Sequence, residues 1–245
     1  MLLISPPFGN YINWSHRKEW NWDVVSVKGT YTWHKRRGLI YHTLRSLRPV
    51  SGGWRNQIGL RNPGIRSVNF NSHSVYSIAA IKQTDWVSLF DFLPQVRLEL
   101  NLSCPNVDEA IIPDFMLDAY IFRFPELIVK VSPNMEMREI EKMIGRGVKT
   151  IHMSNTLQTE KGGISGKMLK EVNLPRVEQL ATKNVQVIAG GGIYSTQDVV
   201  DYWNAGANGF SVSTVLLNYP WRFQKIRNKI KDLQNLNKIN NLHPY

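Results

Sequence analysis

One thiol stands between two carboxamides in the segment ELNLSCPN, which covers residues 99–106. Asn101 precedes Cys104 and Asn106 follows it, at the end of a strand-like run. Because carboxamides both donate and accept hydrogen bonds, the two asparagines can hold the edge of an amide or imide ring. A thiol whose pKa is lowered can take a proton from such a ring. A lone cysteine is more often a buried packing residue, but the flanking asparagines and Pro105 favour a catalytic thiol here.

Two lysines lie within strand-like apolar runs, Lys28 in VVSVK and Lys130 in IVKV. An ammonium group that leaves a buried strand must reach water or meet an anion. A single lysine of this kind is usually a side chain that extends to solvent. Two of them, on two different strands, predict an anionic ligand beside the strand ends.

Polar and glycine-rich segments follow three further runs. Asn155 and Thr156 follow one of them, 161–166 is KGGISG, 189–193 is AGGGI and 211–214 is SVST. Turns rich in glycine expose backbone N–H groups, hydroxyls add further donors, and a helix start favours negative charge. Together these segments predict a phosphate site, at a position where α/β barrels often bind one.

The elements that must position these residues are eight short runs of apolar or β-branched residues. Several are nearly continuous in apolar residues, as expected for parallel strands covered on both faces. Helix-like stretches lie at 135–144, 174–181, 196–205 and about 217–238. This alternation predicts one (β/α)8 TIM barrel, of class α/β, as a single domain over 1–245. The eight predicted strands are 2–6, 24–28, 75–81, 97–103, 127–132, 150–155, 185–190 and 209–214.

The segment 29–74 departs from this alternation, because it has few helix signals and many Gly, Pro, Arg and aromatic residues. We interpret it as a long loop excursion over the C-terminal face of the barrel. Long excursions in compact domains are usually functional. Active sites of such barrels lie at that same face, where the residues described above are expected to meet.

Composition limits the alternatives. The chain of 245 residues has 30 Lys and Arg against 19 Asp and Glu, for a formal charge of +11, which attracts anions of any kind. A solvated basic surface is favoured over a nucleic-acid footprint. With one cysteine and no metal-ligand spacing among six histidines, neither an internal disulfide nor a metal site is expected. The absence of a membrane-span pattern or signal-peptide pattern predicts a cytoplasmic protein.

Six segments, in this order along the chain, resemble the dihydroorotate dehydrogenase family. ELNLSCPNV at 99–107 is the most specific of them. The resemblance covers most of residues 2–220 and is to the class 1 enzymes, which use a cysteine base. The other five segments are NQIGLRNPG at 56–64, VKVSPN at 129–134, NTL at 155–157, GGISG at 162–166 and IAGGGI at 188–193.

The resemblance implies a role for each matching residue and implies FMN as the cofactor. Cys104 corresponds to the catalytic base, and Lys28 to a catalytic lysine beside the substrate carboxylate and the flavin. The implied substrate-binding residues are Asn56, Ile58, Gly59, Leu60, Asn101, Asn106, Asn155 and Thr156. The implied cofactor-binding residues are Ser5, Lys28, Asn101, Lys130, Gly166, Gly191, Gly192, Ser213 and Thr214.

The activity implied is FMN-dependent oxidation of dihydroorotate to orotate in de novo UMP synthesis. The resemblance leans toward the form that passes electrons to NAD through a separate iron–sulfur flavin subunit, with the fumarate-using form next. A homodimer or an electron-transfer subunit is the expected partner. Two alternatives remain, a barrel similar to tRNA dihydrouridine synthase and a shortened, non-catalytic flavin-binding barrel. The second draws on the compressed stretches 107–127 and after Asn155.

Overall fold

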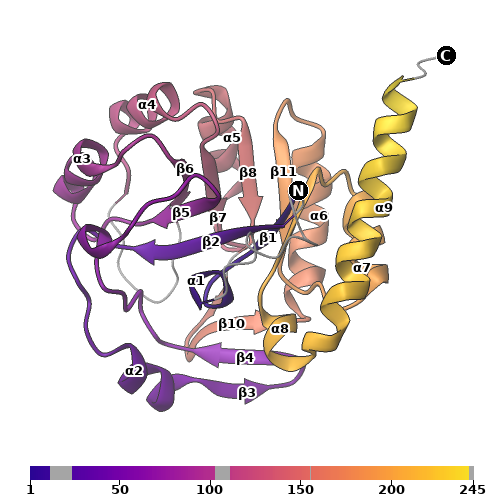
Figure 1. Ribbon diagram of the computed structural model, residues 1–245, viewed down its shortest axis with the longest axis horizontal. Helices are drawn as coiled ribbons and strands as arrows, with labels where there is room; N and C mark the ends of the chain where they lie inside the picture. The colour runs from indigo at the N-terminus through magenta and orange to yellow at the C-terminus, as the bar shows by residue number, and fades with distance from the viewer. Residues whose placement is uncertain (12–23, 103–110, 155, 243–245) are drawn as a thin grey trace.

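Eight parallel strands close into a barrel in the computed structural model, which describes residues 1–11, 24–102, 111–154 and 156–242 (Figure 1). The predicted (β/α)8 architecture is confirmed, and each predicted run overlaps one barrel strand. In order around the barrel, the strands are β1 (Leu2–Ile4), β2 (Val24–Tyr31), β5 (Ser74–Ile78), β6 (Arg97–Asn101), β7 (Ile128–Val131), β8 (Thr150–Met153), β11 (Gln186–Gly190) and β12 (Gly209–Val212), which pairs with β1.

The two faces of these strands bury different clusters, because successive side chains of a strand point to opposite sides. Leu98 and Leu100 of β6 pack with residues of the surrounding helices, such as Trp86. A second, separate cluster fills the barrel interior. Its members are Leu3, Val25, Val27, Val75, Ile128 and Ile188, from five of the strands. Alternation therefore tells which side chains of each strand face inward.

Helices follow the strands and cover the barrel from outside. They are α3 (Gln83–Phe92), α4 (Asp114–Arg123), α5 (Met137–Gly145), α6 (Leu169–Ala181), α7 (Thr196–Asn204) and α9 (Phe223–Leu242). In α7 the Ser195 hydroxyl accepts from the Asp198 N–H, while the Asp198 carboxylate accepts from the Ser195 N–H. This reciprocal cap fixes the helix start.

The single helix predicted over about 217–238 is wrong in its first part. The chain instead forms a short helix α8 (Thr214–Asn218), a 3-10 turn η4 (Pro220–Arg222) and then α9. Proline has no N–H to donate, so Pro220 is tolerated at a helix start and breaks a continuous helix. Beside α7, α9 covers one side of the barrel (Figure 1).

The excursion after β2 contains a helix and part of a second sheet. It forms α2 (Leu39–Ser46), β3 (Arg48–Val50), β4 (Gly53–Asn56) and η3 (Ile65–Ser67), and α1 (Phe8–Tyr11) follows β1. Antiparallel pairing joins β4 to β10 (Gly162–Gly166), which pairs with β9 (Leu157–Thr159). Figure 1 shows β3, β4 and β10 below the barrel, on the side toward which β8 points. The excursion therefore covers the C-terminal face, as predicted, but with more regular structure than its sequence indicates.

Candidate active site

A cavity of about 390 Å³ lies between the carboxyl ends of the barrel strands and the small sheet. This size is within the range of small-molecule sites. Its wall includes α2 side chains, Trp54 of β4, Lys130 of β7 and residues that follow four barrel strands, β1, β8, β11 and β12. Nine predicted site residues line it, namely Ser5, Asn56, Ile58, Lys130, Thr156, Gly191, Gly192, Ser213 and Thr214.

The structure does not bring every predicted residue to this cavity. Lys28 lies on β2 opposite Tyr76 of β5 and is absent from the cavity lining. Asn101 is buried in the barrel wall, where its side-chain amide donates to the Thr30 hydroxyl at 2.9 Å. Gly59, Leu60 and Gly166 are also absent from the lining. Cys104, Asn106 and Asn155 lie outside the described residues.

A buried hydrogen bond between an imidazole and a carboxylate, which the sequence interpretation missed, lies in the barrel interior. The His152 Nδ1 and Glu99 Oε2 atoms are 2.7 Å apart, and both side chains are fully buried. Lys130, which lines the cavity, is the strand neighbour of His152 on one side and of Asn101 on the other. A cation in contact with the cavity therefore sits beside an enclosed acid and imidazole.

The electrostatics of this group favour an ionised carboxylate. Burial alone raises the pKa of Glu99, but the neighbouring His152 and Lys130 outweigh burial and lower the pKa to about 2. Burial lowers the pKa of His152, which favours the neutral ring. A neutral ring donates its Nδ1–H to Glu99, because a carboxylate only accepts. The Lys130 ammonium is then the cation that compensates Glu99.

Two consecutive glycines shape the wall of the cavity beside the start of α6. Gly191 and Gly192 have φ of 81° and 77°, in the left-handed region that favours glycine. A Cβ on Gly192 would lie 2.7 Å from the backbone nitrogen of Lys170, and one on Gly191 would lie 2.9 Å from the Leu169 Cβ. The start of α6 therefore fixes this turn against the cavity. The turn and nearby hydroxyls can hold an anionic group by backbone and side-chain donors.

Hydroxyl groups line the wall between β1 and β12. The Ser5 and Ser211 oxygens are 2.7 Å apart, and Ser213 donates to the Pro6 carbonyl at 2.8 Å. These bonds join the first and last barrel strands at the rim of the cavity. Ser213 and Thr214, both in the lining, are thereby placed near the glycine turn.

The sequence model of a family described as dihydroorotate dehydrogenase matches residues 24–234. This chain belongs to the dihydroorotate dehydrogenase family. The family is flavin-dependent, and its match favours the leading interpretation over the dihydrouridine synthase alternative.

Several curated relatives are catalytic subunits named dihydroorotate dehydrogenase B (NAD(+)). The one from Staphylococcus carnosus is 29% identical over 222 residues, which cover 75% of this chain and 73% of the relative. The one from Bacteroides fragilis is 27% identical over 78% of this chain and 74% of its own. The one from Bacillus mycoides is 32% identical over a match that covers 66% of this chain and 65% of the relative.

Solved structures of the enzyme from Eimeria tenella share the fold. The ligand-free structure has a TM-score of 0.65 and 17% identity, covering 96% of this chain and 84% of its own. The complex with ferulenol has a TM-score of 0.63 and 19% identity, and the match covers 88% of this chain and 76% of that one. At these identities the likeness concerns the barrel alone.

The segment that resembles the dihydroorotate dehydrogenase substrate loop is held in a tight turn. The Asn56 side-chain oxygen accepts from the Ile58 N–H at 3.3 Å, and Arg36 donates to the Gly59 carbonyl. Leu60 has a φ of 52°, rare for a residue with a side chain. Strained backbone of this kind is concentrated at functional sites, which supports the prediction that this turn contacts a ligand.

Sequence reasoning missed Glu99, His152 and the cavity-facing side of α2, which contributes Leu39 and Thr43, with Leu47 directly after the helix. The signal for the first two was present, because each is an ionisable residue between two apolar residues of a barrel strand. Alternation with Leu98 and Leu100 places Glu99 inside the barrel. The α2 helix gives no comparable sequence signal for a cavity-lining role, because none of its residues is buried and its apolar residues therefore do not mark a core-facing side.

Proposed function

We propose that this chain catalyses the FMN-dependent oxidation of dihydroorotate to orotate in de novo UMP synthesis. The observation that carries the proposal is the cavity itself. Residues assigned to cofactor and substrate by resemblance come from distant parts of the chain, and nine of them line one cavity. Family membership supplies the reaction class.

FMN fits the residues that line the cavity. Gly191, Gly192, Ser213 and Thr214 would hold its phosphate, and Lys130 would face its ring. The sequence lacks the G-x-G-x-x-G fingerprint of a dinucleotide site, which favours FMN over FAD. When bound, FMN supplies an acceptor for the hydride that leaves the substrate.

The protein side chains would bind the substrate and take its proton. Dihydroorotate is an anionic cyclic imide, so carboxamides match its ring edge and a cation matches its carboxylate. Asn56 and Thr156 line the cavity, and Asn101, Asn106 and Asn155 complete the proposed set. Cys104 would remove the proton from one ring carbon while the neighbouring carbon loses hydride. Lys28, which the resemblance also assigns to catalysis, lies outside the cavity lining.

The names of the relatives support a partner for this protein. They are catalytic subunits of NAD(+)-linked enzymes, so we propose that electrons leave through a separate iron–sulfur flavin subunit. The fumarate-using form and a homodimer are the next candidates.

We also propose a cytoplasmic location for the protein. Among the described residues, no helix is both long enough and apolar enough to cross a membrane.

Anaerobic mixing of the purified chain, loaded with FMN, with dihydroorotate tests the proposal without an acceptor. Loss of the oxidised flavin absorbance is expected, because the substrate reduces the flavin. Cys104→Ala should keep FMN and slow this bleaching about 10²–10⁴-fold. Bound FMN that dihydroorotate leaves oxidised would support the shortened, non-catalytic barrel. A chain that takes up no flavin would refute both interpretations.

A further inference from the structure

The basic charge of this chain is concentrated in one segment. Residues 24–84 include no Asp or Glu, and their ten basic residues account for +10 of the formal charge of +11. This segment contains the whole excursion that covers the cavity. The ten residues are Lys28, Lys35, Arg36, Arg37, Arg45, Arg48, Arg55, Arg61, Arg66 and Lys82.

Within this segment, α2 presents an apolar face to solvent. Ile40, Tyr41 and Leu44 are 75%, 57% and 74% exposed. Ile40 and Leu44 are four positions apart and thus lie on the same side of the helix. The other side of α2 lines the cavity through Leu39 and its neighbours. The exposed apolar residues therefore form an outward face that packs on none of the described core.

Arginines flank this apolar face. Arg37, Arg45 and Arg48 are exposed just before, within and just after α2. The Arg45 guanidinium lies 5.8 Å from the ring centroid of Tyr41 and donates to its hydroxyl. Arg48 donates to the carbonyls of Leu44 and Leu47 at the helix end. Apolar side chains and cations thus project together from one short helix.

We propose that α2 is the contact by which this protein binds the surface of an anionic phospholipid bilayer. Helices with apolar side chains on one face and Lys or Arg beside them bind at the boundary of headgroups and acyl chains. Each basic residue near an anionic bilayer strengthens binding roughly fivefold. An RNA would match the arginines but would leave Ile40 and Leu44 exposed. A second copy of this chain would place basic segments against each other.

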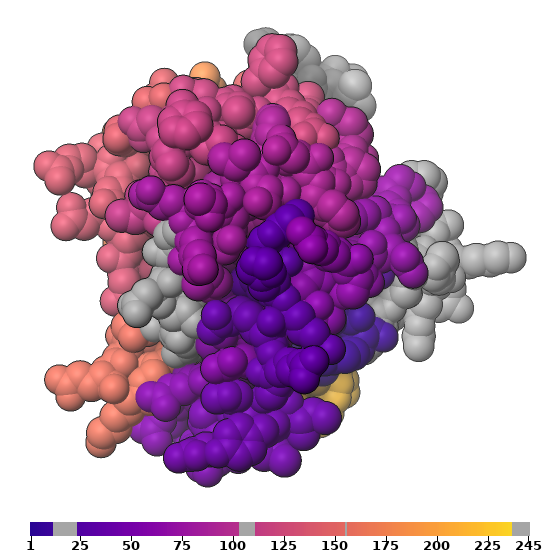
Figure 2. Space-filling view, turned by 90° about the vertical axis from the view of Figure 1, so that its left-hand side faces the viewer, coloured from indigo at the N-terminus to yellow at the C-terminus, as the bar shows by residue number. Residues whose placement is uncertain are grey.

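The location of α2 adds a consequence for the cavity. Because one side of the helix lines the cavity and the other meets the bilayer, binding places the cavity rim at the lipid surface. The atoms at the bottom of Figure 2 belong to the purple part of the chain that includes α2, and the pink atoms at the top include α4. The surface of α4 therefore faces away from the proposed contact and supplies a control.

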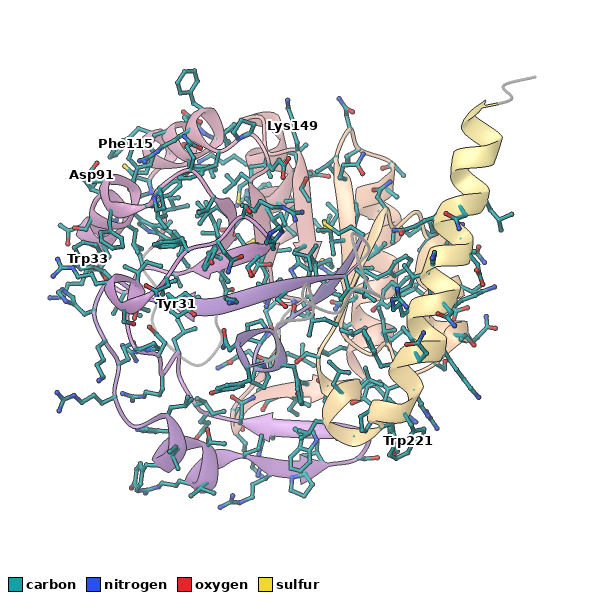
Figure 3. All side chains as sticks on the ribbon, viewed as in Figure 1. Tyr31, Trp33, Asp91, Phe115, Lys149 and Trp221 are labelled. Atoms are coloured by element: carbon teal, nitrogen blue, oxygen red, sulfur yellow. The ribbon has the colours of Figure 1, made fainter. Side chains whose placement is uncertain are left out.

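Sedimentation of the full chain with vesicles tests the proposal. We expect binding to vesicles of phosphatidylcholine with phosphatidylglycerol, weak binding to phosphatidylcholine alone, and loss of binding at high salt. Ile40→Ser with Leu44→Ser should weaken binding roughly tenfold, since less apolar area is buried. Phe115→Ser on α4, where Phe115 is 67% exposed and lies far from α2 (Figure 3), should bind like the parent.

A second pair of variants separates local charge from net charge. Arg37→Gln with Arg45→Gln should weaken binding more than tenfold, whereas Lys225→Gln with Lys231→Gln, on α9, should change binding little. Circular dichroism verifies that each variant is folded. Equal losses in the two pairs, equal binding to both kinds of vesicle, or no binding would overturn the proposal. A dimer that dissociates in the Ile40 and Leu44 variant, without vesicle binding, would assign this face to a second copy.

Discussion

Replacing Glu99 with Gln tests the buried charge group inside the barrel. The substitution keeps the shape of the side chain and removes the negative charge. The buried Lys130 ammonium would then lose the carboxylate that compensates it, and the His152 Nδ1–H would lose its charged acceptor. Breaking a buried pair by removing one partner costs about 3–5 kcal/mol of unfolding free energy. The lowering of the Glu99 pKa from 4.5 to about 2 corresponds to roughly 3 kcal/mol at neutral pH.

Urea denaturation at neutral pH measures this loss, with Glu126→Gln as the matched control. Glu126 pairs with Arg97 at 3.3 Å but its side chain is 75% exposed. An exposed pair contributes under about 1 kcal/mol, so the control should denature nearly like the parent. Equal destabilisation by the two substitutions would refute the assignment of Glu99 as a buried, ionised carboxylate.

The dependence on pH gives an independent check of the same reasoning. Since the folded pKa of Glu99 lies below the unfolded value, its stabilisation is complete above about pH 4.5 and is lost as pH falls toward about 2. The difference in unfolding free energy between the parent and Glu99→Gln should therefore shrink over that window. A difference that stays constant between neutral pH and pH ~3 would show that the charge of Glu99 is not responsible.

Two further predictions concern the cavity wall. Asn56→Ala should weaken orotate binding by about 1–3 kcal/mol in calorimetric titration, because a ring donor or acceptor loses its partner. The control Gln57→Ala changes an exposed neighbour and should bind orotate like the parent. If Asn56→Ala binds orotate as tightly as Gln57→Ala does, Asn56 is not part of the site. Gly192→Ala should weaken FMN binding, since its Cβ would lie 2.7 Å from Lys170 backbone at a φ of 77°. Gly145→Ala is the control, because its new Cβ meets nothing within 4 Å, and it should bind FMN like the parent in fluorescence titration. Similar FMN affinities for Gly192→Ala and Gly145→Ala would contradict the role of the Gly191–Gly192 turn.

The barrel could be predicted from the sequence because its strands are buried on both faces. Runs such as IVKV of β7 and QVIAG of β11 are nearly continuous in apolar residues, and this pattern does not depend on distant partners. Helices α3 and α4 gave weaker signals, since each mixes exposed aromatic residues with buried ones. Phe115 and Phe122 of α4, for example, are 67% and 91% exposed.

The small sheet could not be predicted in the same way. Its strands GWRN and GGISG have little β-branched character, and their pairing depends on backbone contact between distant segments. A Cβ on Gly53 would lie 1.9 Å from the Ser165 carbonyl oxygen, so glycine is required there by tertiary structure alone. The cavity residues Asn56 and Ile58 were therefore identified only through family resemblance.

Closure of the barrel between β1 and β12 has a consequence for when this protein acquires its cofactor. The bond between the Ser5 and Ser211 hydroxyls joins residues 206 positions apart, and that between Ser165 and the Trp54 carbonyl joins residues 111 apart. A chain still on the ribosome lacks one side of the cavity until β12 has emerged, because the first strand has no partner to close against. Flavin loading is therefore expected to follow synthesis of nearly the whole polypeptide, because the wall that carries Ser213 and Thr214 is complete only once β12 has formed.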